Sequence, residues 1–468
     1  MTSVEFSLLE PQSAEPAQRR VAGSLLAAGL APGDRVAFSL ASSADLLLCA
    51  LGALRRGIVP VLLNATLLPA ERDLLLADAD PALTVVDAAG LDALLGGEEA
   101  ELSPYPLARP MHYTSGTTGR SKGVWSGLLD EDDARRLFDD EADLWAFDRS
   151  DTHLVCSPMY HSVSIRFAAA TLLRGGRLVI LSRFDPAAAT EAIVRHRPTT
   201  TFLAPTALQR LLHQQGPPDL LDGFRLIVHA GSPCPPALKR AALDRTGSGV
   251  LWEFYGSTEG QFTACSPDEW VERPGTVGRA RPGRHLRIDN DGVVWCRCPS
   301  FARFRYWQDS AATDRAWRGD EFTVGDLGRL DPDGYLFLDG RRDDLVITGG
   351  VNVYPAEVEA VLTEAPGVVE AAVFGLPDPD WGERVCAAVV GPVTEETLRR
   401  LVADRLAPYK RPKAYFRVDD LPRTSTGKLR RRALPVALGL EPPTDLSSDP
   451  PAGLSSEPPA GLSSGPDP

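Results

Sequence analysis

Apolar and polar positions alternate with two different periods in the N-terminal part of the chain, and this pattern predicts strands and helices in turn. Short apolar runs at Val36–Leu40, Val59–Leu63 and Leu83–Val86 have the length of buried strands. The stretches Ala44–Arg56 and Ala70–Asp78 between them carry apolar residues at helical spacing. Strands that alternate with helices are typical of a parallel sheet covered by helices, so we expect an α/β fold.

The alternation continues through the middle of the chain. The further predicted helices are Ile165–Leu173, Pro186–Arg195 and Thr206–Gln214, and the further predicted strands are Leu178–Leu181, Thr201–Leu203 and Leu226–Val228. An acidic stretch, Glu131–Glu141, predicts a helix whose charges form a solvated face. Between residues 275 and 317 short apolar runs alternate with turn residues, and Asp289-Asn290-Asp291-Gly292 has the composition of a hairpin turn. This region is therefore expected to form a β-rich subdomain.

The last third of the chain predicts a separate, smaller α+β domain. The predicted helices there are Ala356–Leu362 and Glu395–Leu406, and the predicted strands are Val368–Phe374, Val385–Val390 and Tyr415–Val418. A chain of 468 residues is longer than the roughly 250–300 residues over which a single core grows, so we expect two or three domains. The helices and strands just given put the smaller C-terminal domain at about residues 343–438, after a larger one at 1–342. Residues 439–468 are rich in Pro, Ser and Gly and repeat an eight-residue unit, which predicts a disordered acidic tail.

Composition narrows the class of protein. Apolar residues make up 43% of the chain, as in an ordinary globular protein, and no uncharged apolar run of about 18 residues predicts a membrane span. The N-terminus lacks the pattern of a signal peptide, so we expect a cytoplasmic protein. The seven scattered cysteines favour reduced thiols, and Cys296-x-Cys298 lacks the partners of a zinc site. A net charge of −14 argues against nucleic acid as the main partner.

The stretch Thr114–Val124 carries the strongest chemical signal. Its glycines and hydroxyl side chains leave backbone N–H groups free to surround phosphate oxygens, and Lys122 adds positive charge. A Walker loop has four residues between its glycines, whereas Gly116 and Gly119 are separated by two, and Gly123 replaces the Ser or Thr that would follow the lysine. We therefore expect a nucleotide-phosphate loop of a different kind.

Further motifs follow in a fixed order. His229-Ala230-Gly231-Ser232-Pro233 follows a predicted strand, and Phe254-Tyr255-Gly256-Ser257-Thr258-Glu259 follows the helix after that strand. Loops at the carboxyl ends of parallel strands bind ligands, so we expect both motifs near the phosphate loop. Gly325-Asp326, the run Gly340–Asn352 and the basic segment Leu421–Arg431 come later in the chain.

Together these motifs resemble those of the acyl-adenylate-forming enzymes, a family that includes acyl- and aryl-CoA ligases, peptide-synthetase adenylation domains and luciferases. The resemblance covers about residues 34–435 and is greatest to the halobenzoate-CoA ligases. The ATP-binding residues that it implies are Thr114, Ser115, Gly116, Thr117, Thr118, Gly119, Lys122, Gly231, Ser232, Tyr255, Gly256, Ser257, Asp326 and Arg341. It also implies that Tyr255 stacks on adenine, that Asp326 binds the ribose, that Thr258 borders the α-phosphate, and that Thr118 and Glu259 hold Mg²⁺.

The segment after residue 160 bears on the acid substrate. By resemblance, His161 borders the carboxylate site and takes part in catalysis. Peptide-synthetase domains place an aspartate just beyond it to pair with an amino group, whereas residues 163–167 contain no acid, so an α-amino acid is disfavoured. Arg166 is a candidate partner for a second acidic group on the substrate, with a solvated arginine as the alternative. The residues expected to line an apolar acid pocket are Val163, Phe167, Ala230 and Phe254.

The resemblance extends through the C-terminal domain. It implies that Lys428 is the catalytic lysine, whose charge offsets the repulsion between a carboxylate and a triphosphate. It implies a hinge at Asp343 and a face at Gly349 and Gly350 that admits the pantetheine arm of coenzyme A. The residues that resemble the binding site for the nucleotide of coenzyme A are Trp381, Tyr409, Arg411 and Lys413.

These observations predict an ATP- and Mg²⁺-dependent ligase that converts a carboxylic acid to an acyl-AMP and then transfers the acyl group to coenzyme A. Two alternatives stay open at this point. In one, a carrier protein or an amine accepts the acyl group. In the other, the chain is a nucleotide-binding regulator without catalytic activity. No motif identifies the acid or the oligomeric state.

Overall fold

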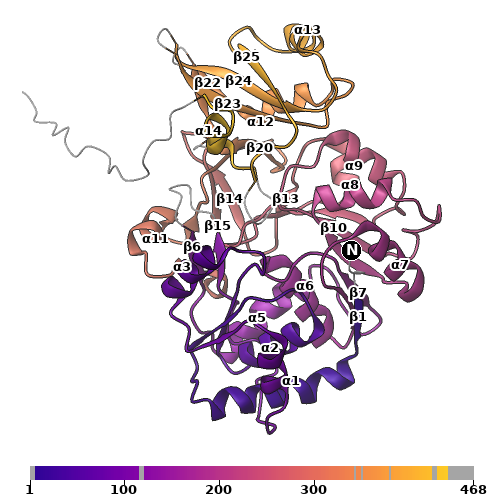
Figure 1. The fold of residues 1–468 in the computed structure, drawn as a ribbon, viewed down its shortest axis with the longest axis vertical. Coiled ribbons are helices and arrows are strands. Elements are labelled where there is room, and N and C mark those ends of the chain that lie inside the picture. The colour runs from indigo at the N-terminus through magenta and orange to yellow at the C-terminus, as the bar shows by residue number, and fades with distance from the viewer. Residues whose placement is uncertain are drawn as a thin grey trace, which may run out of the picture.

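The computed structural model describes residues 6–114, 121–341, 344–348, 351–378, 381–423 and 429–440. In Figure 1 a large body built from the N-terminal two thirds of the chain carries a smaller C-terminal unit at one end. Sheets with helices on their faces make up most of the large body, which confirms the α/β fold expected from the sequence.

The central sheet of the large body has six strands in the order β1-β8-β7-β9-β10-β11. These strands are β1 (Phe6–Leu9), β7 (Thr152–Val155), β8 (Arg177–Leu181), β9 (Thr200–Leu203), β10 (Leu226–His229) and β11 (Leu251–Glu253). All neighbours pair in parallel except β1, which lies antiparallel on the outer edge of β8. The helices of this part are α6 (Ser162–Leu173), α7 (Pro186–His196), α8 (Pro205–His213) and α9 (Pro236–Leu243). The predicted strands and helices of this region are confirmed.

A second parallel sheet, in the order β3-β2-β4, is built from the N-terminal segment. Its strands are β2 (Arg35–Phe38), β3 (Val59–Leu62) and β4 (Leu83–Val85), and the helices around it are α1 (Pro11–Ala27), α2 (Ala44–Leu54), α3 (Pro69–Ala79) and α4 (Ala88–Leu95). The sequence pattern predicted β2 to β4, α2 and α3, but it did not predict β1, α1 or α4.

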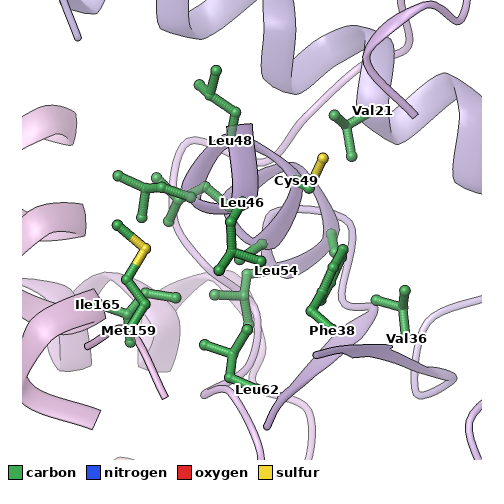
Figure 2. Close-up of a cluster of buried hydrophobic side chains, with 14 of the residues drawn as sticks. Val21, Val36, Phe38, Leu46, Leu48, Cys49, Leu54, Leu62, Met159 and Ile165 are labelled. Atoms are coloured by element: carbon green, nitrogen blue, oxygen red, sulfur yellow. The ribbon is translucent and has the colours of Figure 1, made fainter. Parts of the chain in front are cut away.

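Helix α2 lies at the centre of the largest apolar core. Every residue from Leu46 to Leu54 is buried. Figure 2 shows Leu46 and Leu54 of α2 on the side that faces Met159 and Ile165. Met159 lies in the turn before α6, and Ile165 lies in the first turn of α6. This core therefore fixes the position of α6, the helix that begins directly after His161.

Antiparallel strands form a β-rich subdomain that contains the predicted region, 275–317, and extends beyond it at both ends. Its strands are β5 (His112–Thr114), β6 (Lys122–Trp125), β12 (Thr263–Ala264), β13 (Arg279–Ala280), β14 (His285–Ile288), β15 (Val294–Arg297), β16 (Arg305–Tyr306), β17 (Trp317–Arg318), β18 (Glu321–Phe322), β19 (Asp326–Leu330) and β20 (Leu336–Arg341). The short helices here are α10 (Pro267–Glu272), η1 (Ser300–Ala302) and α11 (Ser310–Ala316). The hairpin predicted at residues 289–292 joins β14 to β15, in which Ile288 pairs with Val294.

The C-terminal unit contains a five-stranded sheet with helices α12 (Pro355–Leu362) and α13 (Glu395–Arg405) packed together. Its strands are β21 (Val346–Thr348), β22 (Val351–Val353), β23 (Glu370–Asp378), β24 (Gly382–Val390) and β25 (Ala414–Val418). A short helix, α14 (Leu434–Ala437), follows. The unit has the elements predicted from the sequence, whereas the hinge predicted at Asp343 and the tail after residue 440 lie outside the described residues.

The acidic helix α5 (Glu131–Ala142) is present, but its last turn differs from the prediction. Glu141 is only 8% exposed and accepts a hydrogen bond of 2.8 Å from the Trp145 indole N–H. The expectation of a solvated face is therefore wrong for this end of the helix. Among the described helices, none combines the length and the apolar character that crossing a membrane requires.

Candidate active site

Strands β5 and β6 hold the two ends of the phosphate loop together. They pair antiparallel, with Thr114 opposite Lys122 and Tyr113 opposite Gly123. The loop residues between them, Ser115, Gly116, Thr117, Thr118 and Gly119, lie outside the described residues. Because its flanks are adjacent strands, the loop starts and ends at the same end of this strand pair.

Lys122 lies next to the Tyr-Gly-Ser-Thr-Glu motif, although the two are more than 130 residues apart. Strand β16 pairs with β6, and this pairing places the Tyr306 ring 4.9 Å from the Lys122 ammonium nitrogen. The Tyr306 hydroxyl donates a hydrogen bond of 2.9 Å to Glu259 Oε1. A cation, an aromatic ring and a buried carboxylate thus form a continuous chain of contacts from the phosphate loop to Glu259.

Arg109 makes a second connection to the same motif. Its Nη2 donates to the Thr258 carbonyl oxygen at 2.6 Å, and both terminal nitrogens lie 3.4 Å from the Glu259 carbonyl oxygen. Burial lowers the pKa of Arg109 to about 10, and the positive charge of Arg166 acts in the same direction. Arg109 therefore fixes the backbone that carries Thr258 and Glu259, and the sequence analysis did not identify it.

The expected nucleoside side of the site is also assembled. The Tyr255 hydroxyl donates to Asp326 Oδ2 at 2.6 Å, so the two residues expected to contact adenine and ribose are in direct contact. Asp326 pairs with Arg341 across β19 and β20, which brings the backbone of Arg341 to the same place. Ser257 Oγ is buried without a hydrogen-bond partner among the described residues.

A buried charge cluster supports the turn at Gly231. His229 ends β10, Glu253 ends β11, and Lys239 on α9 lies between them with its Nζ 3.1 Å from Glu253 Oε2 and 2.5 Å from His229 Nε2. Burial lowers the pKa of His229 well below its ordinary value, so the imidazole is neutral and can accept from the ammonium group. Gly231 follows with φ = 94°, a conformation that disfavours other residues.

The expected carboxylate side contains two histidines. His161 is the residue immediately before α6, and its ring lies 4.6 Å from that of Tyr160. His112 Nδ1 is 2.9 Å from the Tyr160 carbonyl oxygen, and burial lowers the pKa of His112 to about 3. A neutral His112 therefore donates its Nδ1–H to this carbonyl and holds the turn that presents His161.

The four residues expected to line an apolar acid pocket occur together. Val163, Phe167, Ala230 and Phe254 all belong to one buried cluster, in which they pack with Trp145, Phe147 and Phe202. None of the four lines the cavity of about 90 Å³ that lies beside this cluster. That cavity is lined instead by Arg109, Arg166, Gln261 and Arg284 together with residues of α5 and α6.

The C-terminal residues predicted to bind coenzyme A lie on the surface of the smaller unit. Trp381 is 56% exposed and Tyr409 is 39% exposed. The Arg411 side chain donates to the carbonyl oxygens of Leu406 and Ala403, and Lys413 Nζ donates to that of Pro408, so both cations are held near the end of α13. The predicted Gly349, Gly350 and Lys428 lie outside the described residues.

The flanks of the lysine segment are described. Arg423 forms a β-bridge with Leu429, and the Arg430 N–H donates to the Pro422 carbonyl oxygen at 2.8 Å. The described residues on either side of the segment are therefore held next to each other.

The described residues contain no group of three or more His, Cys, Asp or Glu side chains that could hold a metal ion by itself. Glu259, with one oxygen bonded to Tyr306, is the carboxylate that the contacts place beside the phosphate loop. Magnesium in nucleotide sites is commonly bound by one or two carboxylates together with phosphate oxygens, and this arrangement fits that requirement.

Comparison with known protein families gives two matches. Residues 14–106 and 109–296 match the AMP-binding enzyme family, and residues 357–428 match the AMP-binding enzyme C-terminal domain. The chain is 30% identical to a 2-succinylbenzoate–CoA ligase of Bacillus licheniformis, over 89% of this chain and 92% of that protein. An indoleacetate–CoA ligase of Aromatoleum aromaticum is 32% identical, over 88% of this chain and 90% of that protein.

Solved structures of CoA synthetases also match most of the chain. The o-succinylbenzoate CoA synthetase of Bacillus subtilis, in complex with its acyl-adenylate intermediate, has a TM-score of 0.80 at 28% identity, over 90% of this chain and 92% of that chain. The same enzyme is also known in complex with ATP and magnesium ion, again with a TM-score of 0.80 at 28% identity, over 90% of this chain and 94% of that chain.

Proposed function

The chain belongs to the AMP-binding enzyme family, and we propose that it is an ATP-dependent ligase that joins a carboxylic acid to coenzyme A. In the first half-reaction a carboxylate oxygen attacks the α-phosphorus of ATP, the bond to the bridging oxygen breaks, and pyrophosphate leaves. In the second, the thiol sulfur of coenzyme A attacks the acyl carbonyl, the bond to AMP breaks, and the thiol proton passes to solvent.

One observation carries this proposal: the contact chain from Lys122 through Tyr306 to Glu259. It joins the end of the phosphate loop to the motif that contains the proposed magnesium ligand, and Arg109 fixes the same motif from the other side. A cation and a carboxylate beside one glycine-rich loop are what a magnesium–triphosphate complex requires, since one binds phosphate oxygens and the other binds the metal.

The nucleoside would lie between two groups of this site. Tyr255, Asp326 and the turn at Gly231–Ser232 would bind adenine and ribose, with Asp326 accepting hydrogen bonds from the ribose hydroxyls. Gly256 and Ser257 would lie along the phosphates together with Thr114 and the loop residues that follow it. Thr258 would border the α-phosphate, at the end of the chain segment that Arg109 holds.

Magnesium would be held by Glu259, with Thr118 as a second ligand. When bound, the ion would neutralise charge on the phosphate oxygens that changes during pyrophosphate release. The protein contributes the orientation of the carboxylate, because the Tyr306 hydroxyl donates to one of its oxygens.

The acid would approach from the side of α6. His161 would border its carboxylate, and His112 would position His161 through the Tyr160 carbonyl. The apolar part of the acid would reach toward the cluster that contains Val163, Phe167, Ala230 and Phe254. The described residues of this turn place no carboxylate at positions 162–167 to accept an ammonium group.

We propose that residues 1–342 bind ATP and the acid and that residues 343–438 alternate between two positions about Asp343. In one position Lys428 would reach the reacting carboxylate and phosphate. In the other, Gly349 and Gly350 would face the acyl-AMP, while Trp381, Tyr409, Arg411 and Lys413 would hold the nucleotide of coenzyme A.

The two half-reactions provide the test. Lys428→Ala should suppress acid-dependent exchange of pyrophosphate into ATP, because this exchange reports adenylation, and should leave thiolysis of supplied acyl-AMP largely intact. Arg400→Ala, which removes an exposed cation of α13 in the same C-terminal unit, is the control. Equal loss of both half-reactions would contradict the proposal of two positions.

The acceptor can be tested separately. With coenzyme A as acceptor, AMP release should depend on coenzyme A. Trp381→Ala should raise the KM for coenzyme A, because the variant lacks the exposed ring that would stack on the nucleotide. Release of AMP that depends on a carrier protein or an amine instead would support amide or carrier-protein ligation. Failure to form AMP with a broad panel of acids would favour a nucleotide-binding protein without catalytic activity.

A further inference from the structure

A charged cavity adjoins the proposed acid site. Its volume is about 90 Å³, several times the roughly 10–15 Å³ that a single water molecule needs by the same measure. Its walls come from α5, α6, residues 106–110 and the two residues that follow Glu259. Leu54 and Ile165, two members of the core cluster labelled in Figure 2, are among its apolar lining residues.

Arginines outnumber acids around this cavity. Arg109, Arg166 and Arg284 line it together with Asp140 and Glu141, and Arg281 lies behind the two acids. Arg166 forms an ion pair with Glu141, and Arg284 donates to Asp140 Oδ2 at 2.8 Å. Arg281 donates to both acids, at 3.3 Å to Asp140 and 3.4 Å to Glu141.

Four guanidinium groups therefore share two carboxylates. A third acid, Glu259, lies near Arg109. With Glu259 included, four arginines face three carboxylates, so one positive charge remains in excess. Burial would raise the pKa of Glu141, but Arg166 and Arg281 lower it below its ordinary value, so this carboxylate is charged and already engaged. An excess positive charge in a buried site is costly unless an anion compensates it.

Two donors at the cavity have no partner within the described part of the chain. The Nε atoms of Arg166 and Arg284 are buried without a hydrogen-bond partner among the described residues, and Arg284 is only 5% exposed. Arg109 donates only to backbone carbonyl oxygens within the described part of the chain. Arg166 also lies 6.0 Å from the Phe254 ring, so it faces both the cavity and the apolar cluster.

We propose that this cavity binds a second anionic group, a carboxylate, at the far end of the acid substrate. The inference rests on the proposed function and deepens it, because it assigns the substrate to the dicarboxylic acids. Arg166 follows His161 by five residues, which corresponds to roughly 7–8 Å along a helix at 1.5 Å per residue. A short aliphatic or ring-linked diacid spans such a distance, with one carboxylate at His161 and the other among Arg109, Arg166 and Arg284.

A simpler explanation competes with this proposal: the arginines only clamp α5 and α6 to the β-rich subdomain. Asp140 and Glu141 of α5 do contact Arg281 and Arg284, which flank β13 and β14. A pure clamp, however, leaves one positive charge of this buried cluster without a compensating anion. It also gives no reason for a cavity between the arginines that is large enough for more than one water molecule.

The first experiment uses the unmodified protein and matched pairs of acids. Acid-dependent pyrophosphate exchange would be measured with glutarate, adipate and homophthalate, and with the monoamide of each. The two members of a pair have nearly the same shape and differ by one charge. We expect kcat/KM to be at least about tenfold higher for the diacid, since a site built for a polar group discriminates strongly against an analogue that lacks it.

The outcomes separate the two hypotheses. Exchange that is equal or faster with the monoamides would overturn the second-anion site and leave the ligase function standing. Absence of exchange with every acid, including plain monoacids, would overturn both.

The second experiment removes one arginine. Arg166→Met should lower kcat/KM for the preferred diacid by about thirtyfold or more, the usual effect of truncating one partner of a buried charge pair, and should change the value for its monoamide little. Arg174→Met is the control, because Arg174 caps the C-terminus of the same helix, pairs with Asp139 of α5 and with Asp143 directly after it, and does not line the cavity.

The double variant Glu141→Gln/Arg166→Met keeps the experiment informative if the single variant folds poorly, since it removes both charges of the pair. Its thermal midpoint would be measured beside its activity. A loss that is the same for the diacid and the monoamide, in either variant, would show that Arg166 is only structural and would refute the proposed site.

Discussion

The hydroxyl of Tyr306 offers the sharpest test of how the site is built. Tyr306→Phe removes a hydrogen bond of 2.9 Å to Glu259 Oε1 and keeps the ring 4.9 Å from the Lys122 ammonium group. Glu259 is only 6% exposed, so water cannot easily replace the lost donor. The variant therefore isolates one oxygen atom at the proposed magnesium ligand.

The expected magnitude follows from the contact. A hydrogen bond to a charged group contributes about 1.5–3 kcal/mol, and loss of a group that orients a metal ligand typically costs about 10–100-fold in metal affinity. We expect the magnesium concentration for half-maximal pyrophosphate exchange to rise by about 10–100-fold. The KM for the acid should change little, because Tyr306 does not line the cavity beside α6.

The assay is a magnesium titration of exchange at saturating acid and ATP. Tyr335→Phe is a matched control. The Tyr335 hydroxyl also donates to a glutamate, Glu269, at 3.3 Å, but neither residue belongs to the proposed site. An unchanged magnesium dependence in Tyr306→Phe would refute the assignment of Glu259. An equal shift in Tyr335→Phe would show that the effect is not specific to the site.

Three further predictions concern the nucleotide and the stability of the fold. Tyr255→Phe should raise the KM for ATP by about tenfold or more in the exchange assay, because Asp326 loses a charge-assisted hydrogen bond of 2.6 Å; an unchanged KM would contradict this. Lys239→Met should lower the free energy of unfolding in urea by about 3–5 kcal/mol, because Glu253 is left buried without its cation, and Lys239→Met/Glu253→Gln should recover most of it. Burial lowers the pKa of His153 to about 3, whereas in the unfolded chain the side chain has its ordinary pKa of 6.5. The unfolded state therefore binds a proton that the folded state does not, and the free energy of unfolding falls as the pH drops from 6.5 toward 3. Stability at pH 5 should therefore be lower by about 2 kcal/mol on this account, and His153→Gln should show a smaller difference between pH 7 and pH 5.

Local patterns predicted the strands of the parallel sheets because both faces of such a sheet are buried, which produces continuous apolar runs. Strand β1 was not predicted, since it lies on the outer edge of the central sheet and pairs with β8, about 170 residues away. Helix α1 was not predicted either, because three of its six buried residues are alanines and another is a glutamine, Gln18. Its helical period is therefore weak, and its position depends on packing against α2.

Sequence motifs identified proposed site residues only where the residues that act together are also neighbours in the sequence. Tyr306 and Arg109 belong to no motif, and their roles come from strand pairing and from a fold that brings residues 109, 122, 259 and 306 together. Glu141 was misjudged for a related reason. A run of acids usually forms a solvated face, and only the tertiary structure shows that its last member meets Arg166.

The distribution of positive charge gives a physical reason for the second domain. Within the described residues, Lys122 is the cation that the contact chain places beside the phosphate loop, and Arg109 is occupied by the carbonyl oxygens of Thr258 and Glu259. A carboxylate that attacks a polyanionic triphosphate needs more compensation than this, and a fixed cation strong enough for the transition state would also retain pyrophosphate after it has formed. Under the proposed function Lys428 would avoid that difficulty, since a lysine on a domain that turns can leave the site after adenylation. The described residues on either side of its segment, Arg423 and Leu429, are joined by a β-bridge, so both ends of the segment are held at one place.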